Sequence, residues 1–536
     1  MKNLKKLFAV ILSLAMVLGM SITTFADTPG NDGVYGTADD EGTITVSGIE
    51  ENATVTAYKV VEAKYENNGG SFSGYNSLYT SVILNDDLNG DLSLDRETLN
   101  ALADAVNADT AKTAIPMAYA NGKYTATVKP GTYLVLVTDA ETNIYNPMVV
   151  SVYYTNEDGS TNDLVEGNLT IAEGDAEAKV SSQPSVDKVI TNTKKADEND
   201  KGNSVNIGDT VGYEVSVNPV PNYNGSYPVF NVVDTLSKGL EYKDDLSVKV
   251  DGADVPEEYY TVVVNPTAKT DANRDSVTTI TVNFVVDDEY MLNEYAGKKL
   301  VITYSATLKE NADLNENANI NDITLNYTRD SKTEGNDESD NDKTYTYTFD
   351  IDGEATGTKG IINKLGDKDE DKDGLNGASF ALYKESQLKE DGTFDGNPFK
   401  TTESATEGTK KGQLHFTGLE AGTYYLQETS APTGYSVNTT IFKVVISAKY
   451  NTDGTLKEWN VAVGEGVDST PTVAATFTVD SEGAHPGTNP GHDIMNTTLS
   501  QLPSTGGIGT TIFTIAGCVI MIVAAGLFFA SRKKRA

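Results

Sequence analysis

Short runs in which apolar and polar residues alternate recur along most of this chain. They are rich in Val, Thr, Tyr and Ile, and Gly, Asn, Asp or Pro interrupts them, as in residues 43–61, 123–138, 275–286 and 299–308. Because the side chains of a strand point alternately to its two faces, a period of two indicates strands with one buried face. Many such short strands, separated by turn residues, predict an all-β chain built of β-sandwiches.

One segment has helical spacing instead. Residues 95–108 (DRETLNALADAVNA) begin with Asp95 and place apolar residues three and four positions apart. This spacing predicts a helix, and we expect it to decorate the first domain.

The N-terminus has the pattern of a secretory signal peptide. Lys2, Lys5 and Lys6 precede an apolar stretch over 7–20, and small residues at positions 24 and 26 offer a cleavage site. The apolar stretch is too short to span a membrane comfortably. We therefore expect residues 1–26 to be removed, which leaves Asp27 as the mature N-terminus.

The C-terminus predicts a membrane span with a cytoplasmic basic tail. Residues 508–530 form 23 uncharged positions, enough to cross a ~30 Å hydrocarbon core, and Arg532, Lys533, Lys534 and Arg535 follow. Five residues lie just before the span: Leu502, Pro503, Ser504, Thr505 and Gly506. This arrangement resembles the Leu-Pro-x-Thr-Gly sorting signal of Gram-positive surface proteins. The resemblance implies that a sortase cysteine attacks the Thr–Gly peptide and passes the Thr505 carbonyl to an amine.

Composition narrows the class of protein further. The formal net charge is −37, which argues against nucleic-acid binding and suits a soluble surface protein. The single cysteine, Cys518, lies in the predicted membrane segment, so the exported part can form no disulfide. That part has about 480 residues, for which three domains are the natural expectation.

Loosened composition marks the predicted domain boundaries. We expect linkers at 173–185 and at 329–360, the second with a solvated acidic run, and a short stalk at 496–501. The predicted parts are a signal peptide at 1–26, an N-terminal domain at 27–183, a middle domain at 184–350, a third domain at 351–500, and the sorting signal, transmembrane helix and basic tail at 501–536.

In the third domain, three polar residues share strand faces with apolar ones. Lys364 shares its face with Ile362, Glu428 follows Tyr424 and Leu426 at strand parity, and Asn496 pairs in the same way with Ile494. Buried alone, any of the three would cost several kcal/mol. Burial lowers the pKa of a lysine and raises that of a carboxyl, which favours a neutral amine beside a neutral acid.

This combination can make a covalent bond. A neutral lysine amine is a nucleophile, a carboxamide is an electrophile, and a protonated carboxyl can polarise the amide and move protons. We therefore predict an isopeptide bond from Lys364 to Asn496, formed with loss of ammonia and assisted by Glu428.

The middle domain repeats the pattern with different residues. Lys188 lies between Val186 and Ile190 at strand parity, and Asp234 lies among Phe230, Val232 and Leu236 in the same way. Asn319 and Asn321 both align with Ile323, and Asn321 is favoured because it is nearer the apolar run. The predicted trio is Lys188, Asp234 and Asn321, with Asn319 as the alternative to Asn321.

Two longer segments carry a family resemblance. Residues 424–435 (YYLQETSAPTGY) look like the E-box of collagen-adhesin B-type domains, and residues 207–242 look like the middle isopeptide-forming domain of Gram-positive pilins. With the sorting signal, the chain resembles a sortase-assembled major (backbone) pilin. The resemblance implies tandem immunoglobulin-like sandwiches with isopeptide bonds in the second and third domains. We expect each bond to tie the first strand of its domain to the last. We expect no bond in the first domain, where Val replaces the Glu.

The resemblance also implies location and partners. They are a fimbrium covalently anchored to the cell wall, a pilus-type sortase, identical subunits, accessory pilins and peptidoglycan. The family's acceptor lysine lies in a Tyr-Pro-Lys motif that is degenerate here. Lys179 is the only lysine in the linker before Lys188 and is the predicted polymerisation lysine, with Lys194 or Lys195 as substitutes. A monomeric wall-anchored adhesin is the alternative.

The other candidate sites, for metals, have incomplete sequence motifs. Asp369, Asp371, Asp373 and Gly374 have calcium-loop spacing, but Phe380 stands where the loop requires Glu. The histidines lack partners at metal spacing. We expect no metal, no cofactor and no turnover enzyme.

Overall fold

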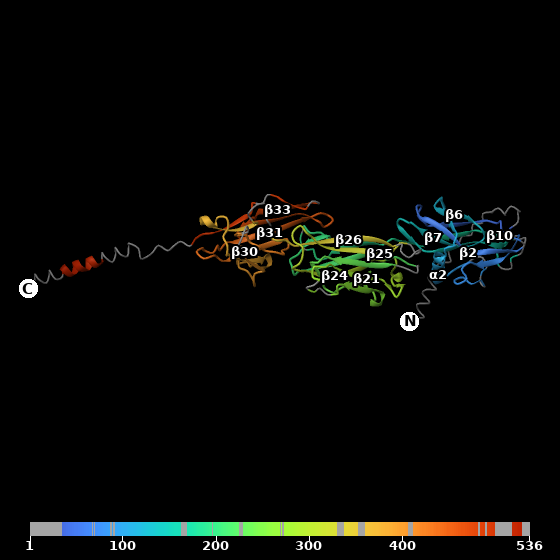
Figure 1. The fold of residues 1–536 in the computed structure, drawn as a ribbon, viewed down its shortest axis with the longest axis horizontal. Helices are drawn as coiled ribbons and strands as arrows, with labels where there is room; N and C mark the ends of the chain where they lie inside the picture. Colours follow the sequence, from blue (N-terminus) through green and yellow to red (C-terminus); the bar gives the residue numbers. More distant parts are fainter. Residues whose placement is uncertain are drawn as a thin grey trace, which may run out of the picture. The chain divides into compact units, whose positions relative to one another are not determined.

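Figure 1 shows the computed structural model of the chain. The structure describes residues 35–66, 68, 70–85, 88, 92–161, 164, 169–193, 195, 197–223, 229–267, 270, 273–329, 337–351, 360–405, 411–480, 483–487, 490–498 and 517–527. The predicted signal peptide at 1–26 and the sorting motif at 502–506 lie outside these residues. The chain is predominantly β, as predicted.

The chain divides into two compact units. The first comprises residues up to 313, 317–347 and 450–455, and contains the first two sandwiches; the second comprises 314–316, 348–449 and the residues from 456 onward.

The first sandwich packs a four-stranded sheet, ordered β11-β1-β6-β5, against a six-stranded one, ordered β10-β9-β7-β2-β3 with β4 beside β2. Strands β12 and β8 form a separate pair. The strands are β1 (Gly42–Ser47), β2 (Thr54–Glu66), β3 (Ser71–Ser77), β4 (Ala114–Pro116), β5 (Ala118–Ala120), β6 (Lys123–Val128), β7 (Gly131–Thr138), β8 (Asn143–Tyr145), β9 (Met148–Asn156), β10 (Leu169–Ala172), β11 (Gly174–Glu177) and β12 (Val180–Ser182). Ile44 and Val46 of β1 meet Val135 of β7 in the core between the sheets.

The predicted helix is confirmed as α2 (Arg96–Ala108). Asp95 caps it, because its side chain accepts a hydrogen bond from the Thr98 amide at 2.8 Å. Leu102 and Val106 are buried in one cluster with Leu134 and Leu136 of β7, so the helix covers a face of the six-stranded sheet.

The second sandwich has sheets ordered β13-β15-β24-β18-β19, with β17 beside β24, and β14-β26-β25-β16-β21-β20. The elements are β13 (Ser185–Ile190), β14 (Gly202–Ser204), β15 (Thr210–Asn218), β16 (Phe230–Leu236), β17 (Leu240–Tyr242), β18 (Ser247–Val250), β19 (Ala253–Asp254), η3 (Glu257–Tyr259), β20 (Thr261–Asn265), β21 (Thr278–Asn283), β22 (Val285–Val286), β23 (Glu289–Tyr290), η4 (Asn293–Tyr295), β24 (Leu300–Leu308), β25 (Asn319–Thr328) and β26 (Asp337–Tyr347). Alternate residues of β16, β24 and β25 are buried, which is the alternation read from the sequence.

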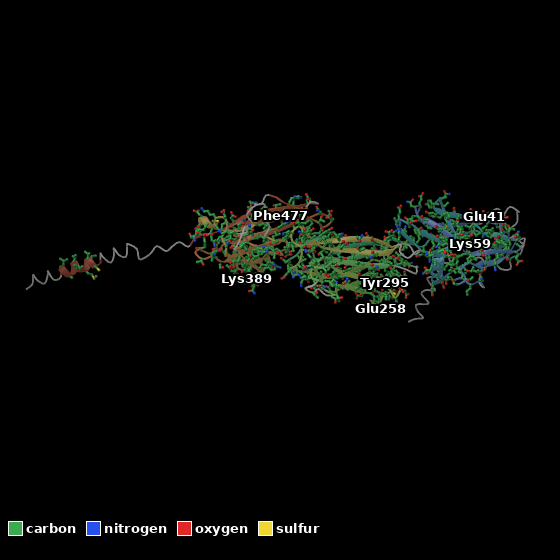
Figure 2. The ribbon with its side chains drawn as sticks, in the orientation of Figure 1. Glu41, Lys59, Glu258, Tyr295, Lys389 and Phe477 are labelled. Carbon is green, nitrogen blue, oxygen red and sulfur yellow. The ribbon has the colours of Figure 1, made fainter. Side chains whose placement is uncertain are left out.

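The third sandwich pairs its first and last strands, β27 and β35, in parallel and adds a seven-stranded sheet ordered β29-β28-β30-β31-β32-β33-β34. The elements are β27 (Ile362–Gly366), η5 (Asp369–Asp371), β28 (Ser379–Lys384), η6 (Glu385–Gln387), β29 (Lys400–Glu403), β30 (Gly422–Ser430), β31 (Ile441–Tyr450), β32 (Leu456–Glu465), β33 (Thr472–Asp480), β34 (Gly483–Pro486) and β35 (His492–Asn496). Trp459 stacks against Phe349 and Phe477, with ring centroids 5.0 and 4.3 Å apart. Phe477 is labelled on this sandwich in Figure 2.

Two expectations about the linkers differ from the structure. Within 173–185, β11 pairs with β1 and β12 pairs with β8, so this stretch forms strands of the first sandwich. The acidic run within 329–360 forms β26, which pairs with β25 along ten residues. Strand pairing with neighbours distant in sequence overrides the low local β-propensity of these segments.

The C-terminal segment is described only over 517–527, which form a helix. Among the described residues, no helix is long and apolar enough to cross a membrane. The remainder of the transmembrane segment predicted at 508–530 lies outside them.

Candidate functional site

The third sandwich brings Lys364, Glu428 and Asn496 together. Lys364 comes from β27, Glu428 from β30 and Asn496 from β35. The Lys364 Nζ donates to Asn496 Oδ1 at 2.5 Å and to Glu428 Oε2 at 3.1 Å. The Asn496 Nδ2 donates to Glu428 Oε1 at 2.7 Å. One carboxylate thus holds the amine with one oxygen and the carboxamide with the other.

Burial is nearly complete at this centre. Lys364 is 0 % exposed, Asn496 1 % and Glu428 3 %. Desolvation lowers the pKa of Lys364, and the charge of Glu428 opposes that shift only in part. The Lys364 Nζ lies 5.7 Å from the centre of the Phe380 ring. A lysine in this setting is a better nucleophile than a solvated one, because its lowered pKa increases the fraction of the neutral amine.

The middle domain gathers Lys188, Asp234 and Asn321. They come from β13, β16 and β25, and all three are buried. The Lys188 Nζ donates to Asp234 Oδ2 at 2.6 Å. Strands β16 and β25 are direct neighbours, with Leu236 opposite Asn321 in the register.

A fourth residue, Tyr304 of β24, joins this centre. Its hydroxyl accepts hydrogen bonds from Lys188 Nζ at 2.8 Å and from Asn321 Nδ2 at 2.7 Å, and it donates to Asp234 Oδ2 at 2.5 Å. The Lys188 Nζ also lies 5.2 Å from the centres of the Tyr304 and Tyr213 rings. Tyr304 was not among the residues predicted from the sequence, although its parity with Ile302 and Ala306 places it on the buried face of its strand.

The electrostatics of the middle centre favour neutral groups. Burial lowers the pKa of Lys188, against the opposing charge of Asp234. Burial likewise raises the pKa of Asp234, against the opposing effect of Lys188. The pKa of Tyr304 is raised well above its ordinary value, first by burial and then by the nearby carboxylate.

The structure separates the two candidate asparagines. Asn319 has a different set of partners: its side chain accepts from the Asp313 amide at 3.0 Å and donates to the carbonyls of Asp313 and Thr346. Asn321 instead faces the hydroxyl of Tyr304. Asn321 also lies on the penultimate strand, because β26 follows β25. The interpretation that the middle bond would join the first strand to the last is therefore wrong.

The candidate polymerisation lysines lie in different settings. Lys179 is exposed between β11 and β12, and its carbonyl accepts from the Asn146 amide at 3.2 Å. The Lys195 Nζ lies 3.6 Å from Glu198 and contacts Ser204. Lys194 lies outside the described residues.

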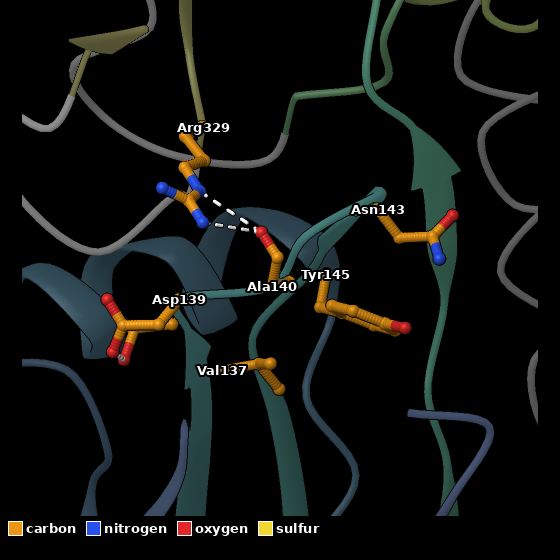
Figure 3. A pocket seen from close by; sticks show the side chains of 7 residues that line it. Val137, Asp139, Ala140, Asn143, Tyr145 and Arg329 are labelled. Atoms are coloured by element: carbon orange, nitrogen blue, oxygen red, sulfur yellow. Dashed lines mark hydrogen bonds between the residues drawn. The ribbon is translucent and has the colours of Figure 1, made fainter. Parts of the chain in front are cut away.

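Other features offer less chemistry. Within the parts of the chain that the structure describes, no cluster of His, Cys, Asp and Glu could hold a metal ion. Asp371, from the rejected calcium pattern, accepts from the Tyr435 hydroxyl at 2.6 Å. A small pocket is lined by residues 137–140, 143 and 145 and by Arg329, whose guanidinium donates to the Ala140 carbonyl at 2.6 and 3.1 Å (Figure 3).

Most of the chain matches models of known protein families. Four family models match: the T6 antigen Ig-like domain at 39–175, the Gram-positive pilin backbone subunit 2, Cna-B-like domain at 207–331, the prealbumin-like fold domain at 359–458, and the LPXTG cell wall anchor motif at 495–536. The chain is also 26% identical to the trypsin-resistant surface T6 protein of Streptococcus pyogenes over 549 residues, covering 92% of this chain and 96% of the relative.

The chain belongs to the backbone pilins of Gram-positive bacteria. The pilin is therefore a structural subunit of a cell-wall-anchored pilus and not an enzyme. Its fold matches that of the T6 backbone pilin of S. pyogenes serotype M6, with a TM-score of 0.54 and 20% identity over 87% of this chain and 100% of that one. A weaker likeness is to the major pilin BcpA of Bacillus cereus, with a TM-score of 0.42 and 16% identity over 86% of this chain and 100% of that one.

Proposed function

We propose that this backbone pilin is a shaft subunit that a pilus-type sortase polymerises by joining Thr505 of one subunit to Lys179 of the next. Intramolecular isopeptide bonds, Lys188 to Asn321 and Lys364 to Asn496, stabilise each subunit. Asp234 and Glu428 assist the two reactions.

The two buried amine–acid–amide clusters carry this proposal. An isolated buried charge costs several kcal/mol, and a protein retains such a group only where it is paired or used. Here the same three chemical types meet twice, in sandwiches with different strand orders. Replacing an amine and a carboxamide by one amide removes the group that is hardest to keep buried.

The reaction needs no cofactor. The lysine nitrogen forms a bond to the asparagine Cγ, the Cγ–Nδ2 bond breaks, and ammonia leaves with one proton that the amine has lost. The carboxyl group moves that proton, as general acid and base. Glu428 suits this role because its oxygens contact both Lys364 and Asn496.

Each bond would stabilise its sandwich by restricting the unfolded chain. Each closes a loop of roughly 130 residues, for which the loop-entropy relation for cross-links gives on the order of 5 kcal/mol.

Exposure of Lys179 supports its role as the acceptor amine. It lies between two short strands, after Ala178 and before the exposed Val180. A sortase acyl-enzyme must reach the amine from solvent, which an exposed site permits and a buried one does not.

Mass spectrometry of the full chain tests the intramolecular bonds. Each bond removes ammonia, about 17 Da, so we expect linked peptide pairs containing Lys188 with Asn321 and Lys364 with Asn496. Asp234→Ala should abolish only the first pair and Glu428→Ala only the second. Glu241→Ala, which removes a partly exposed acid paired with Lys309 in the same sandwich, is the matched control and should leave both. Wild-type chain without either linked pair would refute the proposal.

A further inference from the structure

The two centres place their acids differently. In the third sandwich, Glu428 contacts the lysine with one oxygen and the asparagine with the other. In the middle sandwich, Asp234 contacts Lys188 and Tyr304 through Oδ2 alone. Its Oδ1 and the Oδ1 of Asn321 are both buried and have no hydrogen-bond partner among the described residues.

Tyr304 spans the gap that the shorter acid leaves. Aspartate has one methylene fewer than glutamate, and no hydrogen bond joins Asp234 to Asn321 in the described structure. The Tyr304 hydroxyl provides the missing link, because it donates to Asp234 and accepts from Asn321 Nδ2. It also accepts from the nucleophile, Lys188. One hydroxyl therefore touches all three groups of the reaction.

We propose that Tyr304 is a catalytic residue of the middle domain, whose hydroxyl relays a proton between Asp234 and the leaving nitrogen of Asn321. This inference rests on the proposed isopeptide bond between Lys188 and Asn321. It assigns the middle centre a two-residue relay, Asp234 and Tyr304, where the third sandwich uses Glu428 alone.

Every proton and bonding pair in the relay has a donor and an acceptor within the site. The Lys188 nitrogen bonds to Asn321 Cγ, and the carbonyl electron pair moves to Oδ1. The hydrogen bonds of the resting site reverse for this step: Asp234 in its protonated form donates to the Tyr304 hydroxyl, and the hydroxyl donates to Nδ2. Tyr304 then gives its hydroxyl proton to Nδ2 and takes a replacement from the Asp234 carboxyl, which in turn takes a proton from the Lys188 nitrogen. The pair on Oδ1 restores the carbonyl, the Cγ–Nδ2 bond breaks, and Nδ2 leaves as ammonia. Asp234 and Tyr304 end as they began.

The surroundings of Tyr304 suit a relay. Its side chain is fixed in the middle of β24, and its ring packs against Tyr213 and Tyr242 at centroid distances of 5.2 and 5.9 Å. The four side chains of the site are buried from solvent, so a proton donor within the site has to be one of its own groups. Burial also keeps the phenol protonated, because it raises the pKa of Tyr304, and a relay must start with a proton to give.

Pulse–chase labelling of the full chain tests the relay. After a short isotope pulse, the labelled fraction of linked Lys188–Asn321 peptide is followed by mass spectrometry, with the Lys364–Asn496 pair as a second clock in the same molecule. We expect Tyr304→Phe, which keeps the ring, to slow the middle bond by at least about tenfold, the low end of general acid–base effects. The bond in the third sandwich should form at its wild-type rate.

Two further variants separate chemistry from packing. Tyr290→Phe is the matched control, because Tyr290 is another buried tyrosine of the same sandwich whose hydroxyl donates to the Pro221 carbonyl; it should leave the rate unchanged. Asp234→Glu in the Tyr304→Phe chain supplies the longer acid found in the third sandwich and should restore most of the rate.

The outcomes decide between the readings. A wild-type rate in Tyr304→Phe overturns the relay, and so does an equal loss of rate in Tyr290→Phe, which would indicate packing alone. If Tyr304→Phe alone prevents folding of the middle sandwich, the double variant Asp234→Glu, Tyr304→Phe decides. The relay is overturned if this double variant folds and still forms the middle bond at least about tenfold more slowly than the wild type. If wild-type chain never yields the middle linked pair, the proposed bond itself fails; if wild type and Tyr304→Phe link equally, only the relay fails.

Discussion

Complete burial of a lysine side chain is the residue-scale feature that sets the chemistry of both centres. Lys188 and Lys364 are each 0 % exposed. Burial penalises the ammonium form, so the pKa of both falls, while the neighbouring acids limit the fall. The same burial that makes the amine nucleophilic destabilises the fold as long as the proposed bond is absent, so variants that cannot form the bond should have a distinctive pH dependence.

An unlinked middle domain should become more stable as pH rises. Asp234→Ala should prevent the proposed bond, and it removes the charge that raises the pKa of Lys188, so we expect the folded-state pKa of Lys188 to lie further below the unfolded value near 10.4. Between the two values the unfolded chain binds more protons, and the free energy of unfolding increases with pH by up to about 1.4 kcal/mol per unit. Urea unfolding of the variant at pH values from about 7 to 10 measures the slope.

The control is the double variant Asp234→Ala, Lys188→Met, which lacks the titrating amine. Its stability should be nearly flat over the same pH range. Equal slopes in the two variants would show that Lys188 has an ordinary pKa in the folded state, contrary to its burial.

At the scale of residues, strand parity made most of the middle centre predictable from the sequence. Lys188, Asp234 and Asn321 could be picked out because each interrupts an apolar face with a polar group. Tyr304 could not, because tyrosine is an ordinary core residue in the alternating run 300–308, and nothing in the run marks its hydroxyl as different. Only the meeting of four strands shows that this hydroxyl lies among the other three groups.

At the scale of elements, acidic side chains of β26 hold the first strand of the middle domain. The Val186 amide donates to Asp340 Oδ2 at 2.7 Å, and the Lys188 amide donates to Asp342 Oδ2 at 2.6 Å. Lys201 offsets the charge, since its Nζ donates to Asp342 at 2.5 Å and to the Lys188 carbonyl at 2.6 Å. Carboxylates thus replace a strand-to-strand ladder between β13 and β26.

Removing one carboxylate should loosen β13. Asp342→Ala leaves the Lys188 amide without its acceptor, which costs about 1–3 kcal/mol and speeds exchange of that amide proton by roughly tenfold to a hundredfold. Hydrogen exchange read by NMR or mass spectrometry measures the effect. Ser339→Ala, an exposed change on the same strand, should have none. Unchanged exchange in Asp342→Ala would mean that the carboxylate does not protect β13.

The acidic run shows where local pattern fails. Residues 337–343 read as a solvated linker because they contain no apolar side chain. In the structure they form a strand paired with β25, and two of the carboxylates face the backbone of β13. Local composition cannot reveal backbone donors that lie about 150 residues away in sequence.

At the scale of the whole molecule, the two proposed bonds would carry tension differently. Asn496 lies on β35, the last described strand of the third sandwich, so a bond to Lys364 joins its first and last strands. Asn321 lies on β25, and the following β26 remains outside the loop that Lys188 and Asn321 would close. The middle sandwich therefore keeps a segment that force can extract even when the bond is present.

Single-molecule stretching of the full chain should detect this segment. Residues 322–347 amount to 26 positions (347 − 322 + 1), so a linked middle sandwich should lengthen by about 90 Å. Asp234→Ala should add an event on the order of 450 Å, as residues 188–321 unravel. A linked chain that never lengthens would show that β26 bears force without yielding, and an Asp234→Ala chain that lacks the longer event would argue against the bond.

Polymerisation through Lys179 can be tested on pili extracted from the cell wall. Wall extracts on a denaturing gel should show a high-molecular-weight ladder that disappears with Lys179→Ala, because the acceptor amine is gone. Lys195→Ala is the comparison, since that amine contacts Glu198 and Ser204. Persistence of the ladder in Lys179→Ala with loss in Lys195→Ala would move the acceptor to Lys195, and a single wall-linked band in wild type would favour the monomeric adhesin.

The sequence by itself determined the all-β class, the helix at 96–108, the sorting signal and the alternation that turns two lysines inward, because each depends on residues close together in the chain. Tertiary structure decided that Asn321, and not Asn319, lies in the cluster with Lys188 and Asp234. It also decided that the acidic run is a strand and that the Tyr304 hydroxyl connects the Asp234 carboxyl to the Asn321 carboxamide. These depend on the distance between atoms on different strands, and strand parity reports a face without reporting what lies opposite it.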